Sequence, residues 1–422
     1  MIGKRTKGVV LIGDGLADRP VPALDGKTPL EVADTPFLDR IAADGECGQM
    51  DPIAPGVRAG SDTSHLAILG YDPHKVYTGR GPFEVVGIGM EVRGGDVCFR
   101  GNFATVDGDL KLSPEGTFSG AQVADRRAQR IAQGTEELAA ALSGTTIEDV
   151  TCYVKESVEH RAGLVLRGPG LGTRVTDIDP HSDGEPPHGA VGEDEASHKT
   201  ARILNQFVLL SWHKLKDHPV NKDRLAANKL PANILLPRGA GVAPHLQPFA
   251  ERYGIPGACV VETGLIAGIG RYLGMTVPEV AGATGGADTD ELALAKAVVA
   301  MLADHDFVLC NLKAPDLGGH DGDPGAKIAA AQKLDNLAHH VLQHGPGDLH
   351  LALTADHCTP ITFGDHTGDT VPIAIRGPHV RPDSVRAFDE RAVVAGALGR
   401  IRGFDLMPIL TNLMGGQEKF GA

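Results

Sequence analysis

The chain of 422 residues lacks most features that mark secreted, membrane or disulfide-bonded proteins. It has only six cysteines and no CxxC pair, so we expect reduced, buried thiols rather than a disulfide framework. No apolar run approaches the roughly 20 residues that a membrane-spanning helix needs. Aromatic residues make up only 4% of the chain, whereas glycine is abundant with 55 residues, so tight turns should outnumber bulky core anchors.

The chain also lacks any excess of positive charge. It carries 40 Lys+Arg against 54 Asp+Glu, a formal net charge of −14, which argues against nucleic acid or an anionic membrane as its partner. A local basic pocket for a small anion remains compatible with this charge. The basic segment 1–7 precedes an apolar run of only residues 8–13, which is too short for a secretory leader. We therefore expect a cytoplasmic protein of enzyme size with two or three structural units.

Four short apolar runs predict buried parallel strands at residues 8–13, 306–312, 349–354 and 371–375. Helical patterns lie between them at 290–304 and 326–343. This alternation predicts an α/β fold with a mainly parallel sheet flanked by helices. Ligands of such sheets lie at the carboxyl ends of the strands, and that is where Asp14, Asp316 and Asp356 fall.

The middle of the chain has a different pattern. It combines strand-like pieces at 151–154 and 163–167, a charged helix at 119–142 and a polar loop at 177–198. We interpret it as an inserted α+β cap or substrate domain. The expected organisation is a metalloenzyme core in two parts, 1–93 and 239–422, with the insertion at 94–238.

Several metal-ligating residue types follow the predicted strands. Asp316 and His320 are four residues apart and would share one helix face, although a simple turn is an alternative. Asp356-His357 ends a buried strand, where a salt bridge or a cap is the alternative, and His366 follows in the next loop. With Asp14 the set has three carboxylates and three imidazoles, which suits Mn²⁺, Zn²⁺ or iron better than Ca²⁺. Six ligands are enough for two adjacent metal ions.

Ser61 follows Gly60 at the start of a predicted helix, 63–69. A helix N-terminus favours an anion, and a serine hydroxyl that touches a metal could attack phosphorus. An ordinary helix-capping serine is the alternative interpretation.

Motifs along nearly the whole chain carry a family resemblance. In chain order they are LIGDGLADRP at 11–20, GKTPL at 26–30, ADTP at 33–36, GSD at 60–62, LGYDP at 69–73, YTGRGP at 77–82 with Glu84, HPVNK at 218–222, GATG at 282–285, APD at 314–316, GH at 319–320, DH at 356–357 and TP at 359–360. The chain thereby resembles the archaeal-type cofactor-independent (2,3-bisphosphoglycerate-independent) phosphoglycerate mutases of the alkaline phosphatase superfamily.

This resemblance implies an alkaline-phosphatase-like core with an inserted cap. It also implies interconversion of 3-phosphoglycerate and 2-phosphoglycerate through a phosphoserine, without bisphosphoglycerate. Ser61 would be the nucleophile, and two divalent metal ions are implied, with Mn²⁺ expected and Zn²⁺, Co²⁺ or Mg²⁺ as alternatives. The implied ligands are Asp316, His320 and His366 for one ion, and Asp14, Ser61, Asp356 and His357 for the other. Asp365, beside His366, could act as a supporting partner or as a competing ligand.

A phosphoglycerate carries a phosphate and a carboxylate, so its pocket needs cationic side chains, above all arginine. The candidates are Arg80, Arg100, His160, Arg161, Lys222 and Arg224, with Lys313 next to the metal motif. The alternatives are a phosphatase, a phosphonate hydrolase or another mutase of the same superfamily, acting on a related small phosphorylated or phosphonate substrate. The oligomeric state stays open.

Overall fold

A computed structural model describes residues 5–417 and 421, so part of the basic segment 1–7 lies outside the described residues. The chain forms two compact units, Met1–Tyr77 with Leu246–Ala422, and Thr78–His245. The sequence placed the corresponding boundaries at 93/94 and 238/239. The first of them differs most because helix α5 (Gly81–Gly87) packs against strands of the second unit.

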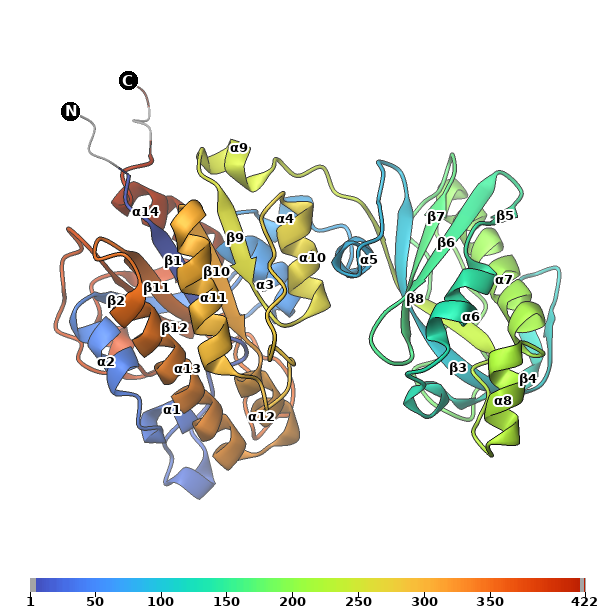
Figure 1. Ribbon diagram of the computed structural model, residues 1–422, viewed down its shortest axis with the longest axis horizontal. Coiled ribbons are helices and arrows are strands. Elements are labelled where there is room, and N and C mark those ends of the chain that lie inside the picture. The colour runs from blue at the N-terminus through green and yellow to red at the C-terminus, as the bar shows by residue number, and fades with distance from the viewer. Residues whose placement is uncertain (1–4, 418–420, 422) are drawn as a thin grey trace. The chain divides into compact units, whose positions relative to one another are not determined.

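The first unit is built on a seven-stranded sheet in the order β13-β2-β12-β11-β1-β10-β9 (Figure 1). Its strands are β1 (Gly8–Gly13), β2 (Glu46–Asp51), β9 (Gly257–Val260), β10 (Phe307–Leu312), β11 (His350–Ala355), β12 (Val371–Arg376) and β13 (Gly399–Arg402). Every residue of β1, β10 and β11 is buried, as their unbroken apolar runs predict.

Helices lie on both faces of this sheet, with α11 and α13 in front of it in Figure 1. The α-helices of the unit are α1 (Pro29–Val32), α2 (Pro36–Ala43), α3 (Ser61–Ile68), α4 (Pro73–Val76), α9 (Phe249–Tyr253), α10 (Gly264–Tyr272), α11 (Glu291–Asp304), α12 (Ala314–Asp321), α13 (Pro324–His344) and α14 (Leu406–Leu413). Short 3₁₀ helices are η1 (Pro22–Leu24), η3 (Ala392–Ala395) and η4 (Gly403–Asp405).

The predicted α/β class and mainly parallel sheet are confirmed. Strands β9, β10, β1 and β11 run parallel to one another, and β13 runs parallel to β2. The prediction was wrong for 371–375, because β12 pairs antiparallel with both β11 and β2. Its apolar run shows that both faces are covered, and it does not reveal the direction of the strand.

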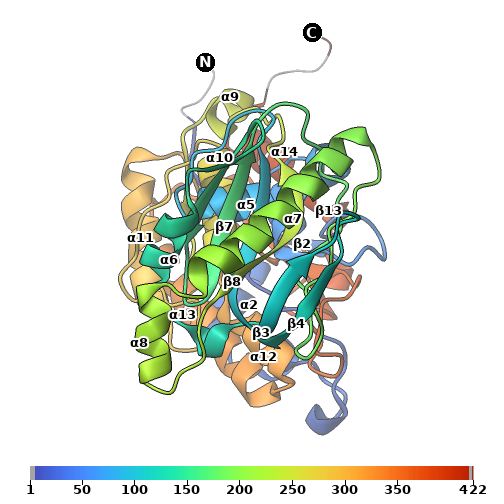
Figure 2. The ribbon, with the colours of Figure 1, turned by 90° about the vertical axis from the view of Figure 1, so that its right-hand side faces the viewer.

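The second unit holds a sheet in the order β4-β3-β7-β6-β5, with β8 paired to β3. Its strands are β3 (Val97–Leu112), β4 (Phe118–Asp125), β5 (Thr145–Ile147), β6 (Val150–Glu156), β7 (Arg161–Arg167) and β8 (Ile234–Val242). Its remaining helices are η2 (Ala128–Arg130), α6 (Thr135–Leu142), α7 (Glu195–Leu215) and α8 (Pro219–Ala226). Figure 2 shows α7 lying across this sheet, where Phe207 and Trp212 join the core of the unit.

Two predictions for this unit were wrong. Residues 119–142 are not one helix, because Phe118–Asp125 is an edge strand with Phe118, Ala121 and Val123 buried, and only Thr135–Leu142 is an α-helix. The loop predicted at 177–198 ends earlier, because Asp194 caps α7 by accepting a hydrogen bond from the Ser197 amide. Helix α7 itself was missed. Within the part of the chain that the structure describes, no helix is long and apolar enough to cross a membrane.

Candidate active site

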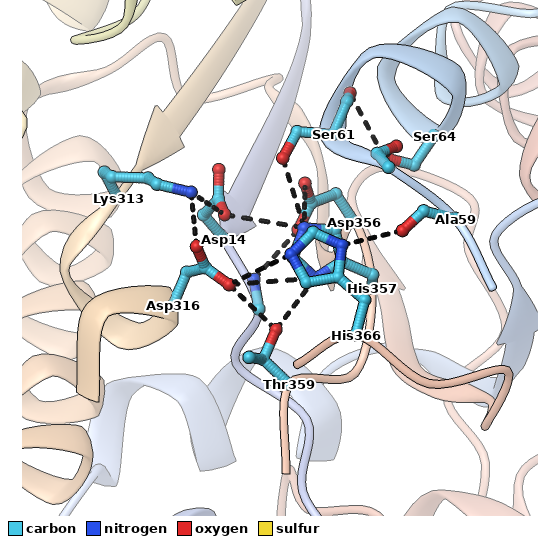
Figure 3. A network of polar contacts seen from close by, with 12 residues as sticks. Asp14, Ala59, Ser61, Ser64, Lys313, Asp316, Asp356, His357, Thr359 and His366 are labelled. Carbon is cyan, nitrogen blue, oxygen red and sulfur yellow. Dashed lines mark hydrogen bonds and ion pairs between the residues drawn. The ribbon is translucent and has the colours of Figure 1, made fainter. Parts of the chain in front are cut away.

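Three buried carboxylates meet at one edge of the first unit's sheet. Asp14 follows β1, Asp356 follows β11, and Asp316 lies in the first turn of α12 just after β10. These three strands are neighbours and parallel, so their carboxyl ends share an edge. All three side chains are almost fully buried, and Figure 3 shows them gathered around His357.

Together with these carboxylates, two histidines form two groups of side chains whose ligand atoms are close enough to share a metal ion. One group joins Asp14, Asp356 and His357, and another joins Asp316, His357 and His366, with the ligand atoms of each group within 4.8 Å of one another. His357 Nε2 lies 3.2 Å from Asp356 Oδ2, and His366 Nε2 lies 3.6 Å from Asp316 Oδ1. His320 belongs to neither group, yet its Nε2 lies 3.5 Å from Asp316 Oδ2.

In each of the three expected histidine ligands, Nδ1 is held by a hydrogen bond. The acceptor is Thr359 Oγ1 for His357 at 3.0 Å, Gly364 O for His320 at 2.9 Å and Ala59 O for His366 at 2.8 Å. Thr359 in turn donates its hydroxyl proton to Asp316 Oδ1. The network thus assigns the proton to Nδ1 and leaves Nε2 as the electron-pair donor, the arrangement of a metal-ligating imidazole.

Ser61 is the first residue of α3, and its side chain belongs to the same cluster. Its Oγ lies 3.2 Å from His357 Nε2 (Figure 3). One turn later, the buried His65 donates from Nδ1 to the Ser61 carbonyl at 2.6 Å. Asn311 donates to His65 Nε2 and to Asp14 Oδ2, both at 3.1 Å, and so links the serine segment to β1.

Lys313 places a positive charge between the two groups. Its Nζ donates to Asp14 Oδ1 at 2.8 Å and to Asp316 Oδ2 at 2.5 Å. Burial alone would lower the pKa of Lys313, but the two carboxylates raise it, so the side chain stays an ammonium ion. Burial alone would raise the pKa of the Asp316 carboxyl, but the nearby His366 imidazole and the same ammonium outweigh it and lower that pKa.

The remaining charges are less well compensated. Burial and the neighbouring Asp356 raise the pKa of Asp14, and burial raises the pKa of Asp356. Asp356 Oδ2 has no hydrogen-bond partner, and burial lowers the pKa of His357 to about 3, so this imidazole is neutral. A buried carboxylate oxygen without a donor, beside a neutral imidazole, fits a site that receives a cation.

Gly15 gives these side chains room. It has a φ of +59°, and a Cβ there would lie 2.6 Å from both Asp316 Oδ1 and Thr359 Oγ1. Its amide donates to Asp356 Oδ1 at 2.9 Å. Only glycine allows the backbone to approach both carboxylates this closely.

The second unit contains a basic pocket of about 200 Å³ that is almost entirely polar. Its lining residues are Asn102, Arg126, Arg127, Arg130, Glu159, His160, Arg161 and Arg238. Five guanidinium groups thus face one lining carboxylate, in a chain whose net charge is −14. A second carboxylate, the buried Asp179, accepts hydrogen bonds from Nε and Nη2 of Arg126, both at 2.7 Å, and lies 3.6 Å from Arg238 Nε. The excess of positive charge is suited to a small anion.

Backbone strain is concentrated beside this pocket. Ala128, Gln129 and Arg130 all have φ between 44° and 54°, and Glu159 has φ of 54°. Each such conformation costs a non-glycine residue about 1–2 kcal/mol. A run of three left-handed residues places Arg127 and Arg130 at the pocket, and strain of this kind is typical of functional sites.

The sequence candidates of this unit have different surroundings. His160 and Arg161 line the basic pocket, and burial lowers the pKa of His160 to about 4. Arg100 is largely buried, its Nε has no hydrogen-bond partner, and burial together with nearby Arg238 and Arg80 lowers its pKa to about 10. Arg80 itself pairs with Glu84 at 2.8 Å.

Two further candidates lie elsewhere. Arg224 donates to the carbonyl oxygens of Leu230 and Ala128, both at 2.8 Å, so its guanidinium supports the backbone rather than facing the pocket. Lys222 is an exposed residue of α8. The structure therefore brings neither of them to the pocket lining.

Sequence reasoning missed Arg126, Arg127, Arg130 and Arg238 as site residues. Three of them lie within five residues, in a segment predicted to be helical, where charged side chains suggest only a solvated face. Their clustering depends on the left-handed turn and on pairing with the distant Asp179. Asn311 and Thr359 were also missed, although both lie next to or within the motifs that carry the ligands.

Comparisons with known proteins agree along the whole chain. A family model described as 2,3-bisphosphoglycerate-independent phosphoglycerate mutase matches residues 42–221. The chain is 52% identical to the 2,3-bisphosphoglycerate-independent phosphoglycerate mutase 1 of Methanothermobacter thermautotrophicus over 422 residues, covering 99% of this chain and 100% of that protein. It is 48% identical to the similarly named protein of Methanopyrus kandleri, covering 100% of this chain and 99% of that one.

Two solved structures have similar folds. The PH0037 protein from Pyrococcus horikoshii matches with a TM-score of 0.84 at 36% identity, over 100% of both chains. The cofactor-independent phosphoglycerate mutase from Thermoplasma acidophilum matches with a TM-score of 0.71 at 36% identity, over 97% of this chain and 100% of that one.

Proposed function

Because this chain belongs to the family of 2,3-bisphosphoglycerate-independent phosphoglycerate mutases, we propose that its reaction passes through a phosphoserine on Ser61. Its activity is that of the family, the metal-dependent interconversion of 3-phosphoglycerate and 2-phosphoglycerate in glycolysis and gluconeogenesis. The expected alkaline-phosphatase-like core follows from the same membership. The observation that carries the phosphoserine is the position of Ser61 Oγ, at a helix N-terminus and 3.2 Å from His357 Nε2.

Two divalent cations are part of this proposal, with Mn²⁺ first and Zn²⁺, Co²⁺ or Mg²⁺ as alternatives. Asp316, His320 and His366 would hold one, and Asp14, Ser61, Asp356 and His357 the other. The donor chemistry supports this, because the three imidazoles present Nε2 and Asp356 Oδ2 lacks a hydrogen bond. When bound, such cations neutralise charge on phosphoryl oxygens and ease ionisation of a serine hydroxyl.

The phosphoryl group is then transferred twice, first to Ser61 and then back to glycerate. In the first, Ser61 Oγ forms a bond to phosphorus while the bond to the 3-oxygen of the substrate breaks, and the serine proton ends on the 3-hydroxyl of glycerate. In the second, the 2-hydroxyl attacks the phosphoserine and its proton returns to Ser61. The Lys313 ammonium and the N-terminus of α3, where Ser61 lies, would supply fixed positive charge to the phosphoryl oxygens.

We propose that the basic pocket of the second unit binds the substrate's carboxylate. A mutase must retain glycerate between the two steps, since water would otherwise take the phosphoryl group. Arg127, Arg130 and Arg161 are exposed and line the pocket, so their guanidinium groups are available to a carboxylate. Arg126 and Arg238 are braced by Asp179 and would set the shape of the pocket.

The cytoplasm is the proposed location of this reaction. All six cysteines are free and buried, and burial raises the thiol pKa of Cys47 and Cys152 to about 12. Such thiols are suited to a reducing compartment, where disulfides are rare.

The test follows ³¹P signals during incubation of Mn²⁺-loaded protein with 3-phosphoglycerate, without bisphosphoglycerate. The proposal expects 2-phosphoglycerate without free phosphate, and loss of turnover in Ser61→Ala. Ser64→Ala is the matched control, because Ser64 lies in the same helix and its hydroxyl bonds only to carbonyl oxygens. Undiminished turnover in Ser61→Ala would refute the phosphoserine, and release of free phosphate would indicate a hydrolase instead.

A further inference from the structure

The loop Gly364–His366 holds two of the expected metal ligands at once. It contributes His366 itself, and the Gly364 carbonyl accepts the Nδ1 proton of His320 at 2.9 Å. Both imidazoles direct Nε2 toward Asp316, at 3.5 Å from His320 and 3.6 Å from His366. The position of this short loop therefore controls one whole ligand group, Asp316, His320 and His366.

Arg58 ties this loop to the segment that leads into Ser61. Its Nε donates to the His366 carbonyl at 2.7 Å, and its Nη2 donates to Asp365 Oδ2 at 2.6 Å. The other carboxylate oxygen of Asp365 accepts the His366 amide at 2.8 Å. The guanidinium also lies over the Phe363 ring, 5.4 Å from its centroid.

The next residue, Ala59, completes the attachment. Its carbonyl accepts the Nδ1 proton of His366 at 2.8 Å, as Figure 3 shows. Arg58 thus fixes the backbone of His366 while Ala59 fixes its ring. Two residues later the same segment reaches Ser61, so the ligand loop and the nucleophile share one support.

We propose that Arg58, acting with Asp365, is a positioning residue for metal binding by Asp316, His320 and His366. The inference rests on the proposed metal assignment. Arg58 bonds to the His366 backbone and to the Asp365 carboxylate, and its own side chain is 54% exposed. An exposed ion pair of this kind adds little to global stability. Its effect should therefore fall on the placement of the two imidazoles, because groups that orient metal ligands commonly change metal affinity about 10-fold or more.

The same unit contains a matched control. Arg402 is 51% exposed, pairs with Asp405 at 3.0 Å and lies 4.1 Å from the Phe404 ring centroid. Arg402 therefore has the same two kinds of neighbour as Arg58, a carboxylate and a phenyl ring. None of the expected metal ligands takes part in the contacts of this second set.

The experiment titrates metal-free protein with Mn²⁺ and follows the loss of the free Mn²⁺ signal by electron paramagnetic resonance, without substrate. Wild type is compared with Arg58→Ala, Arg58→Lys, Asp365→Asn and Arg402→Ala. We expect the midpoint to rise about 10-fold in Arg58→Ala and less in Arg58→Lys, which keeps one of the two contacts. Arg402→Ala should match wild type, and the melting temperatures of the two alanine variants without metal should agree.

Kinetics give a second readout. At saturating Mn²⁺, kcat of Arg58→Ala should recover, and KM for 3-phosphoglycerate should equal the wild-type value, because Arg58 positions ligands and not substrate. An unchanged Mn²⁺ midpoint in Arg58→Ala, or an equal rise in Arg402→Ala, would overturn the inference. Failure of the metal assignment itself would be seen separately, as absence of Mn²⁺ binding by wild type.

Discussion

Replacing Gly15 by alanine should lower activity because the new methyl group would collide with the Asp316 side chain. This steric effect can be separated experimentally from the strain of a left-handed backbone. Gly15 has a φ of +59°, and a Cβ there would meet Asp316 Oδ1 and Thr359 Oγ1, both at 2.6 Å. Atoms do not approach this closely without bonding, so the Asp316 carboxylate and its hydrogen bond from Thr359 must shift.

The matched control is Gly26→Ala. Gly26 has a similar φ of +75°, but a Cβ there would find nothing within 4 Å. Both variants should therefore lose about 1–2 kcal/mol from the left-handed conformation. Gly15→Ala should lose about 1–3 kcal/mol more from overpacking against buried groups.

The effect on activity should differ far more. A displacement of the carboxylate by about 1 Å is expected to lower kcat/KM for 3-phosphoglycerate about 100-fold in Gly15→Ala, whereas Gly26→Ala should keep wild-type activity. The assay combines thermal melts with initial rates at saturating Mn²⁺. Wild-type activity in a folded Gly15→Ala protein would refute the close packing of Gly15, in the turn after β1, against Asp316.

Three further outcomes follow from the charges. Arg161→Ala should raise KM for 3-phosphoglycerate about 10-fold with a smaller change in kcat, since one charged hydrogen bond is worth about 1.5–3 kcal/mol. A fall in kcat at constant KM would contradict the role of Arg161 in binding substrate. In denaturant melts with EDTA, Lys313→Met should lower the free energy of unfolding by about 3–5 kcal/mol, because two buried carboxylates lose their ammonium partner. In melts with Mn²⁺ the loss should be smaller, because the cation would neutralise the same carboxylates. Burial raises the pKa of Glu390 from 4.5 to about 7, so its contribution to stability is present below pH 4.5 and is lost as the pH rises through 7. Melting temperatures of wild type should therefore fall relative to Glu390→Gln between pH 5 and pH 8, and parallel curves would contradict this.

The metal cluster could be predicted from sequence because buried parallel strands have a strong signature. Unbroken apolar runs place Asp14 and Asp356 at strand ends, and the parallel pairing of β1, β10 and β11 brings those ends together. The same signal failed for β12, whose run is equally apolar although the strand is antiparallel. Burial on both faces determines composition, and it does not determine direction.

The basic pocket could be predicted only in part. His160 and Arg161 were candidates from the sequence. Arg127 and Arg130 reach the pocket through a left-handed turn, and that turn contains neither glycine nor asparagine, the residues that usually mark such a conformation. Arg126 and Arg238 are brought together by Asp179, more than 50 residues from each along the chain. Long-range ion pairs and strained turns leave no periodic pattern, so this site required three-dimensional structure.

The phosphoryl group on Ser61 is the central claim, and rapid quenching tests it most directly. Mn²⁺-loaded protein would be mixed with 3-phosphoglycerate, quenched in acid within one turnover, digested, and its peptides measured by mass spectrometry. The account predicts one added phosphoryl group on the peptide that contains Ser61, localised to that residue by fragmentation and absent without substrate. Turnover with unmodified Ser61, or with the phosphoryl group on another side chain, would contradict it.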